Sequence, residues 1–307
     1  MTRSLKIATR RSALAMWQAE HVRDLLTQAD PGLRVELVPI VTRGDRVIDR
    51  PLAQVGGKGL FLKELEEALL DGRADLAVHS MKDVPTELEP GLALSATLAR
   101  ANPFDAWVCP SGDTPETLPA GARVGTSSLR RRCQLLAVRP DLEVRDLRGN
   151  VDTRLKRLDD GDYDAIVLAC AGLDRLGLSQ RITAELQPPD WLPAATQGII
   201  TIEQRAGDDA VRERLARLND PLAQDQARAE RAVVARLEGS CQVPLAAHAS
   251  ITADRLALAA MVGSPDGRTV LRAAAEGPCG NAESIGLQAA EALLAQGADR
   301  IISALNR

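Results

Sequence analysis

Apolar and polar residues follow a repeating strand–helix pattern over the first hundred positions. The apolar run 5–9 predicts a strand, and apolar residues at helical spacing predict a helix over 12–28. Further strands are expected at 34–41 and 74–78, with an amphipathic helix over 60–70 between them. This order of elements predicts a mainly parallel sheet with helices on its faces.

A similar pattern begins again after Asn102 and Pro103. Strands are expected at 123–125, 142–147 and 164–169. The helix after the first of them is expected to begin at Ser127 or Ser128, and another is expected to begin near Asn150. Both helix starts carry unpaired backbone N–H groups that suit an anion.

The pattern changes again in the last third of the chain. A strand at 198–203 follows a proline-rich connection and is expected to return to the first domain. Beyond it we expect helices at 227–237 and 284–296, and alternating strands at 255–262 and 269–276. The fold class is therefore α/β, with a small C-terminal α+β domain. The predicted boundaries are 1–99 with 198–218 for domain 1, 100–197 for domain 2, and 219–307 for domain 3.

Composition narrows the class of protein. Of the 307 residues, 45% are hydrophobic and 26% are charged, which is typical of a globular chain. No apolar run approaches the ~18 residues that a membrane span needs, and no signal region precedes the first strand, so a cytoplasmic location without membrane attachment is expected. The five cysteines are scattered, which argues against both disulfides and a metal site.

The charge is unevenly distributed. The chain carries a net charge of −4, yet residues 123–157 hold ten basic and four acidic side chains, a local charge of +6. Aromatic residues make up only 2%, so few side chains can stack on bases, and a nucleic-acid partner is not expected. A concentrated basic segment on an acidic protein favours a small polyanionic ligand.

Three segments place reactive or anion-binding side chains at predicted sheet edges. The segment 125–132 combines hydroxyls with guanidinium groups at a helix start and suits carboxylates, although a capped helix with a solvated basic face explains it equally well. Asp83 follows a buried strand, where open α/β sheets bind ligands, but Lys82 and Asp83 also fit a surface ion pair. Arg10 and Ser12 follow the first strand, and Ser12 is as well explained as a helix cap. His79 is expected to be structural.

Two loops complete the candidates. The glycine-rich residues 56–59 lack the spacing of a nucleotide-binding loop and are expected to form a mobile lid or a plain flexible loop. Cys241 lies in a loop bounded by glycine and proline, where a thiol is accessible and reactive. Spacing alone leaves open a harmless loop cysteine, or a Cys241–His248 pair of a cysteine hydrolase.

Together these segments resemble the porphobilinogen deaminase family over essentially the whole chain. The resemblance depends on the joint order of ATR at 8–10 with Ser12, VTRGD at 41–45, VGGKGLF at 55–61, HSMKDVP at 79–85, GTSSLRR at 125–131, LRGN at 147–150 and CQVP at 241–244. It implies two domains like those of type II periplasmic binding proteins, with a hinged active cleft between them, and a third domain. It also implies hydroxymethylbilane synthase activity, in which four porphobilinogen molecules are condensed head to tail.

The resemblance also implies roles for particular residues. Cys241 matches the cysteine that carries a covalent dipyrromethane cofactor, and Asp83 matches the carboxylate that stabilises the cationic azafulvene intermediate. Contacts to the cofactor are implied for Lys82, Thr126, Ser128, Arg130, Arg131 and Arg154. Contacts to the substrate are implied for Arg10, Ser12, Arg148, Arg154, Arg175 and Gln197. Lys58 and Phe61 belong to the implied lid.

Three positions depart from the family pattern, namely Gln54, Thr196 and Ser240. Porphobilinogen is the expected substrate, and the chain is expected to act as a monomer. The main alternative is a non-catalytic dicarboxylate binder built like a periplasmic binding protein, because an arginine-lined cleft also suits dicarboxylates. Such a binder would not need Cys241 or a third domain.

Overall fold

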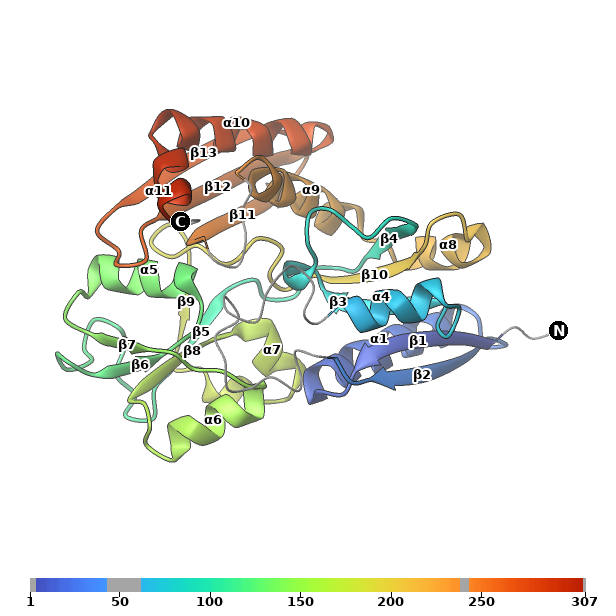
Figure 1. Ribbon diagram of the computed structural model, residues 1–307, viewed down its shortest axis with the longest axis horizontal. Coiled ribbons are helices and arrows are strands. Elements are labelled where there is room, and N and C mark those ends of the chain that lie inside the picture. Colours follow the sequence, from blue (N-terminus) through green and yellow to red (C-terminus); the bar gives the residue numbers. More distant parts are fainter. Residues whose placement is uncertain (1–3, 43–61, 238–242, 306–307) are drawn as a thin grey trace. The chain divides into compact units, whose positions relative to one another are not determined.

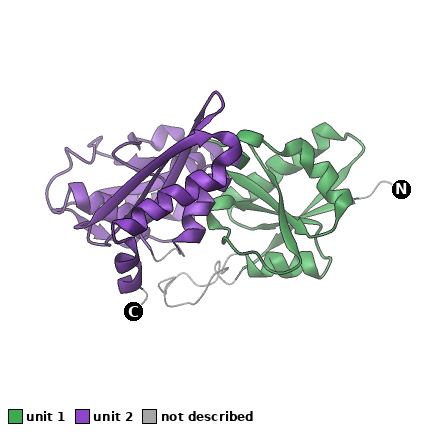
Figure 2. Cartoon of the chain, turned by 90° about the horizontal axis from the view of Figure 1, so that it is seen from above, with its two compact units in different colours: residues 1–101, 199–224 green, residues 102–198, 225–307 purple. Residues whose placement is uncertain are grey.

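The computed structural model describes residues 4–42, 62–237 and 243–305 of the chain. The chain forms two compact units, Met1–Ala101 with Ile199–Gln224, and Asn102–Gly198 with Asp225–Arg307 (Figure 2). The first unit corresponds closely to the predicted domain 1. The second unit contains most residues of both later predicted domains, but residues 100–101 and 219–224 belong to the first unit. The division into three domains stays a prediction.

Unit 1 is built on a five-stranded mixed sheet with the order β2-β1-β3-β10-β4 (Figure 1). Its strands are β1 (Ser4–Arg10), β2 (Arg34–Ile40), β3 (Leu76–Ser80), β4 (Leu92–Thr97) and β10 (Ile200–Arg205). β1 runs parallel to β2 and β3, whereas β10 lies antiparallel between β3 and β4. The late strand therefore returns to the first sheet, as the sequence predicted.

Helices cover both faces of this sheet. On one face, α1 (Ala13–Ala29) buries Ala19, Val22 and Leu26 in a core that also contains the inward side chains of β1, β3 and β10. On the other face, α4 (Lys63–Leu70) packs Leu65 and neighbouring residues against β1 and β3. A third helix, α8 (Asp209–Leu215), follows β10. The turns after β1 and β3 consequently meet at one edge of the sheet.

Unit 2 contains a second five-stranded mixed sheet, with the order β7-β6-β8-β5-β9. Its strands are β5 (Asp105–Val108), β6 (Arg123–Gly125), β7 (Glu143–Arg145), β8 (Ala165–Ala169) and β9 (Ala184–Leu186). Its helices are α5 (Leu129–Val138), α6 (Val151–Asp159) and α7 (Cys170–Arg175). β6 is parallel to β7 and β8, and β5 is antiparallel to β8 and β9.

The C-terminal part of unit 2 is a three-stranded antiparallel sheet covered by helices (Figure 1). Its strands are β11 (Leu245–Thr252), β12 (Arg255–Gly263) and β13 (Val270–Pro278), and its helices are α9 (Pro221–Arg236), α10 (Ala282–Ala295) and α11 (Ala298–Leu305). Alternate residues of β12 pack with the apolar faces of the helices in one core. The expected α/β class and the small C-terminal α+β part are confirmed.

Candidate active site

A small pocket lies at the ends of β1 and β3 in unit 1, with a volume of about 80 Å³. It is lined by Arg10, Ser12 and Asp83, three candidates that come from two separate segments of the sequence. The remaining lining residues are Leu14, Ala15, Gln18, Leu62, Val78, His79 and Ser80. The turns after two neighbouring parallel strands thus bring a guanidinium, a hydroxyl and a carboxylate together.

Local structure explains how Asp83 reaches this pocket. Strand β3 ends at Ser80, and Met81–Asp83 form one turn of 3₁₀ helix. Met81 is buried, and its backbone N–H donates to the carbonyl of Ile199 at 2.9 Å, which fixes the turn to the chain entering β10. Because Met81 anchors the turn, Lys82 and Asp83 remain exposed at the edge of the sheet.

Ser12 has the capping role that the sequence left open. Its side chain accepts a hydrogen bond from the backbone N–H of Ala15 at 3.4 Å, and it precedes the first residue of α1. Ser12 is also one of the residues that line the pocket.

Gln18 and His79 also line this pocket, and sequence reasoning assigned them no role in it. Gln18 is buried, and its Nε2 donates to Oγ of Ser80 at 2.9 Å, which links α1 to the end of β3. The available signal was a polar residue in line with Val22 and Leu26 on the core face of α1.

The second candidate region lies in unit 2, where β6 leads into α5. Ser128 is the N-cap of α5, with its Oγ accepting from the backbone N–H of Arg131 at 3.4 Å. Oγ1 of Thr126 accepts from the backbone N–H of Ser128 at 3.2 Å, and Ser127 donates to the carbonyl of Leu147 at 2.9 Å. Hydroxyls and a helix N-terminus therefore lie together, a combination that suits a carboxylate ligand.

Gly125 permits the close packing at the base of this region. A Cβ atom at Gly125 would lie 2.8 Å from Cδ1 of Tyr163 and 2.9 Å from Cδ2 of Leu147. The strand end therefore has no room for a side chain, and the backbone leads into Thr126 without a bulge.

Arg130 and Arg131 are buried together against one carboxylate, that of Asp105. Nη1 of Arg130 donates to Oδ2 of Asp105 at 2.7 Å, and Nη2 of Arg131 donates to Oδ1 at 2.6 Å. Arg130 also donates to the carbonyl of Leu192, and Arg131 to that of Val167. Much of the hydrogen-bonding capacity of both guanidinium groups is used inside the protein, and their predicted contacts to the cofactor stay predictions.

Sequence reasoning did not identify Asp105, although it organises this cluster. Nε1 of Trp191 and Nε2 of Gln197 also donate to its carboxylate, at 2.7 and 3.0 Å. Burial alone would raise the pKa of Asp105, but the charges of Arg130 and Arg131 and their hydrogen bonds outweigh burial and hold it well below its usual range. The buried carboxylate thus offsets part of the positive charge that the two arginines bring.

The other predicted contacts have local hydrogen bonds. Nε of Arg154 donates to the carbonyl of Gly149 at 2.7 Å, and Nη2 of Arg175 donates to that of Gly198 at 2.7 Å. Burial lowers the pKa of Arg175 to about 10, so its guanidinium is still charged at neutral pH. Arg148 is half-buried and directly precedes Gly149.

Several predicted features lie outside the described residues. They are Lys58 and Phe61 of the lid, Cys241 of the cofactor loop, and the departures Gln54 and Ser240. The third departure, Thr196, is described: it has a left-handed backbone with a φ of 59°, and its N–H donates to the carboxylate of buried Glu230 at 2.5 Å.

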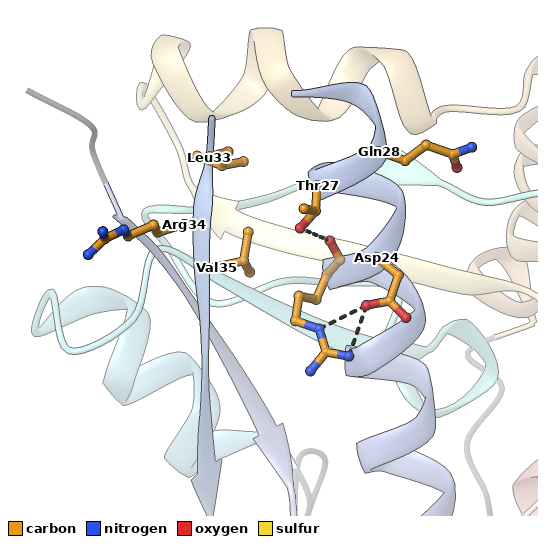
Figure 3. Close-up of a pocket in the computed structure, with 7 residues that line it drawn as sticks. Asp24, Thr27, Gln28, Leu33, Arg34 and Val35 are labelled. Carbon is orange, nitrogen blue, oxygen red and sulfur yellow. Dashed lines mark hydrogen bonds and ion pairs between the residues drawn. The ribbon is translucent and has the colours of Figure 1, made fainter. Parts of the chain in front are cut away.

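A larger hollow, of about 690 Å³, lies between α1 and β2 and is wide open to solvent (Figure 3). Its wall includes an exposed ion pair, Arg23 with Asp24 at 2.8 Å, beside Thr27. It contains none of the predicted site residues, so we favour the smaller pocket beside Asp83.

In the described parts of the chain, no helix is long and apolar enough to cross a membrane, and no group of three His, Cys, Asp or Glu side chains could hold a metal ion.

Comparison with known protein families identifies both parts of the chain. Residues 5–213 match the model described as porphobilinogen deaminase, dipyromethane cofactor binding domain, and residues 225–295 match the porphobilinogen deaminase C-terminal domain. The chain belongs to the porphobilinogen deaminase family. It therefore has hydroxymethylbilane synthase activity, a transferase reaction of tetrapyrrole biosynthesis that condenses four porphobilinogen molecules on a dipyrromethane cofactor.

Solved structures similar to this porphobilinogen deaminase family member are periplasmic-binding-protein-like. A periplasmic VFT2 domain of BvgS from Bordetella pertussis is 19% identical over 75% of this chain and 92% of its own, with a TM-score of 0.42. A TRAP periplasmic solute binding protein from Desulfovibrio salexigens is 14% identical over 77% of this chain and 78% of its own, with a TM-score of 0.44. At these scores the likenesses carry no argument about function. The match to both family domains favours the enzyme over the dicarboxylate binder.

Proposed function

We propose that Asp83 is the catalytic carboxylate of this porphobilinogen deaminase and that Arg10 and Ser12 bind substrate beside it. One observation carries the proposal: the three residues line a single pocket at the edge of the first sheet. Each porphobilinogen brings an acetate and a propionate, which a guanidinium and a hydroxyl bind well. Loss of ammonia leaves a positive charge on the substrate's pyrrole, and an exposed carboxylate in the same pocket stabilises that charge.

We further propose that Cys241 anchors the dipyrromethane and that Lys82, Thr126, Ser128, Arg130, Arg131 and Arg154 bind its carboxylates. The bound cofactor supplies the primer to which each pyrrole is added. The N-terminus of α5 and the hydroxyls of Thr126 and Ser128 support this assignment. Arg148, Arg175 and Gln197 complete the substrate contacts. In this proposal the enzyme acts as a cytoplasmic monomer, without a nucleic-acid partner.

Intact-protein mass spectrometry tests the attachment. The wild-type protein is expected to exceed its sequence mass by one dipyrromethane and to give the pyrrole colour reaction, whereas Cys241→Ser is expected to have the bare mass. A wild-type preparation that has the bare mass and still makes tetrapyrrole would contradict the covalent primer. His248→Gln is the control for the hydrolase alternative, and it is expected to retain activity.

Asp83→Ala tests the catalytic assignment. We expect this variant to fold and to carry the cofactor, because Asp83 is exposed and all the proposed cofactor contacts except Lys82 lie in unit 2. Turnover of porphobilinogen is expected to fall at least 100-fold, the usual scale for losing an acid–base or charge-stabilising group. Near-normal production of hydroxymethylbilane by the loaded variant would refute the role of Asp83.

A further inference from the structure

The chain makes a tight turn over residues 194–197, in the segment between β9 and β10. The backbone N–H of Gln197 donates to the carbonyl of Ala194 at 3.1 Å, and Thr196, the third residue of the turn, has a φ of 59°. A positive φ at the third position is that of a type II turn, which usually has glycine there. Thr196 is β-branched, so it adopts this conformation at a cost that glycine would avoid.

A buried carboxylate from a distant element holds this turn. Glu230, on α9, is fully buried, and its Oε2 accepts the backbone N–H of Thr196 at 2.5 Å. Its Oε1 accepts the backbone N–H of Ala249, on β11, at 2.6 Å. The edge strand of the C-terminal sheet thus fixes one oxygen, and the other oxygen binds the strained residue. An apolar side chain at position 230 would leave both buried N–H groups without this acceptor.

The last residue of the turn connects it to the arginine cluster of unit 2. Nε2 of Gln197 donates to Oδ1 of Asp105 at 3.0 Å and to the carbonyl of Pro103 at 2.8 Å. The same Oδ1 accepts hydrogen bonds from Nε and Nη2 of Arg131. The backbone dihedral angles of Thr196 determine the direction in which the chain continues. A change at Thr196 would therefore move the Gln197 amide relative to Asp105.

We propose that Glu230 is a positioning residue of the porphobilinogen deaminase reaction and that it acts through the strained turn at Thr196. The carboxylate keeps Thr196 in the left-handed conformation, which keeps the Gln197 amide on Asp105. Asp105 in turn orients the guanidinium groups of α5 that we propose bind the carboxylates of the dipyrromethane. This inference rests on the proposed function, because it acts through those cofactor contacts.

Small displacements of these guanidinium groups affect the reaction, because the side chains that bind the primer determine where the next C–C bond forms. A displacement of about 1 Å in a group that orients a reactant can lower the rate about 100-fold. The proposed substrate contacts Arg10 and Ser12 lie in unit 1 and are not part of this hydrogen-bonded chain. KM for porphobilinogen is therefore expected to change less than kcat.

Glu230→Met tests the proposal, because methionine has a similar size but is only a weak hydrogen-bond acceptor. In the cofactor-loaded variant, kcat is expected to fall about 10-fold or more. The double variant Glu230→Met/Thr196→Gly is expected to recover most of this loss, because glycine adopts the left-handed turn without help from the carboxylate.

Ala253 provides the matched control. Apart from Thr196, it is the one non-glycine residue in the described part of the chain with a positive φ, of 55°, and it is exposed in the turn between β11 and β12. Ala253→Gly relieves the same kind of backbone strain in a different turn. It is expected to leave kcat of the wild type unchanged and to give no recovery in Glu230→Met. Recovery at position 196 alone therefore excludes a general gain in stability as its cause.

Trp191 reports on the arginine cluster independently of activity. Its Nε1 donates to Oδ2 of Asp105 at 2.7 Å. The chain has three tryptophans, so ¹⁵N labelling of the indoles gives three side-chain NMR signals, which Trp191→Phe assigns. The Trp191 signal is expected to shift in Glu230→Met and to return in the double variant. The signal of Trp107, whose Nε1 donates to the carbonyl of Asp113 at 2.9 Å, is expected to stay in place.

A wild-type kcat in loaded Glu230→Met would overturn the proposal, as would equal recovery by Thr196→Gly and Ala253→Gly. If Glu230→Met does not fold, Thr196→Val decides. It keeps the carboxylate but loses the hydrogen bond from Oγ1 of Thr196 to the carbonyl of Ala195, at 2.7 Å, which stabilises the turn. A lower kcat with a shifted Trp191 signal would support the proposal, and wild-type values would overturn it.

Failure of both Glu230→Met and Thr196→Val to fold would show that the turn is only structural and would also overturn the proposal. A failure of the proposed function is recognised separately: the wild type would then lack the cofactor, or Asp83→Ala would remain active.

Discussion

At the residue scale, one acidic side chain holds two arginines that we propose as contacts to the cofactor. Asp105 is fully buried and is contacted by Arg130, Arg131, Trp191 and Gln197. The carboxylate of Asp105 fixes the side chains of Arg130 and Arg131 in place. One carboxylate between two guanidinium groups also leaves a net positive charge, which suits an anionic ligand. Arg130 and Arg131 are thereby held before any ligand arrives.

Asp105→Asn is expected to destabilise the protein by about 3–5 kcal/mol, because it leaves two buried arginines without their carboxylate. Urea unfolding at pH 7 measures this loss. Asp164→Asn is the matched control, since Asp164 pairs with Arg123 at 2.8 Å on the surface, with both side chains about a third exposed. It is expected to cost less than about 1 kcal/mol. Equal losses in the two variants would contradict the role given to Asp105.

The same variant has a defined pH dependence. Because folding lowers the pKa of Asp105, its contribution to stability is fully present above its unfolded pKa of about 3.9 and is lost as the pH falls below that value. The stability difference between wild type and Asp105→Asn is therefore expected to be constant from pH 7 to 5 and to narrow below pH 4. Urea midpoints across this range measure this stability difference. A difference that widens on acidification would contradict a lowered pKa of Asp105 in the folded protein.

At the scale of elements, the end of β6 is packed too closely for any side chain at Gly125. Gly125→Ala is expected to destabilise the protein by about 1–3 kcal/mol through overpacking against Tyr163 and Leu147. Gly280→Ala is the control, because nothing lies within 4 Å of its Cβ position and its φ is not positive. Thermal unfolding compares the two variants. A Gly125→Ala protein as stable as the control would show that the neighbouring side chains move aside.

Elements with a strong pattern were predictable, and those without one were not. The strand predicted at 198–203, after the proline-rich connection, is found as Ile200–Arg205. The start of α5, predicted at Ser127 or Ser128, is found with Ser128 as the N-cap. Strand β11 was missed because its sequence, LAAHASIT, is rich in alanine and contains few residues with high strand propensity. The helix predicted over 60–70 is described from Lys63.

The residues of the candidate site also fall into those that the sequence indicates and those that it does not. Arg10, Ser12 and Asp83 could be chosen because each lies at the end of a strand or within three residues of it, and parallel strands end at a common edge. Asp105 could not be chosen, because its importance depends on which distant strands and side chains surround it. In the sequence, a buried aspartate cannot be distinguished from an exposed one.

At the scale of the whole molecule, unit 1 depends on two segments that lie far apart in the sequence. Strand β10 is hydrogen-bonded to both β3 and β4 and contributes Ile200 and Ile202 to the core. Its removal leaves β4 without a neighbour in the sheet. The first 101 residues alone therefore lack a strand from the interior of the sheet rather than one from its edge.

A fragment of residues 1–101 is accordingly expected to show no cooperative unfolding. The same fragment joined through a short glycine–serine linker to residues 199–224 is expected to unfold cooperatively. Such a linker can connect the two ends, because the backbone N–H of Leu98 is bonded to the carbonyl of Ile200 at 2.9 Å. Circular dichroism during urea titration distinguishes the two, and a cooperative transition in the shorter fragment would contradict the prediction.

The internal position of β10 also determines the order of folding during synthesis. Residues 1–101 leave the ribosome first, but the strand that joins β3 to β4 is translated only after the entire second sheet. Domains usually fold from the N-terminus as they emerge. Here the N-terminal sheet can be completed only after residue 205 has left the ribosome. Until then the edge of β3 is unpaired and is exposed to chaperones and neighbouring chains.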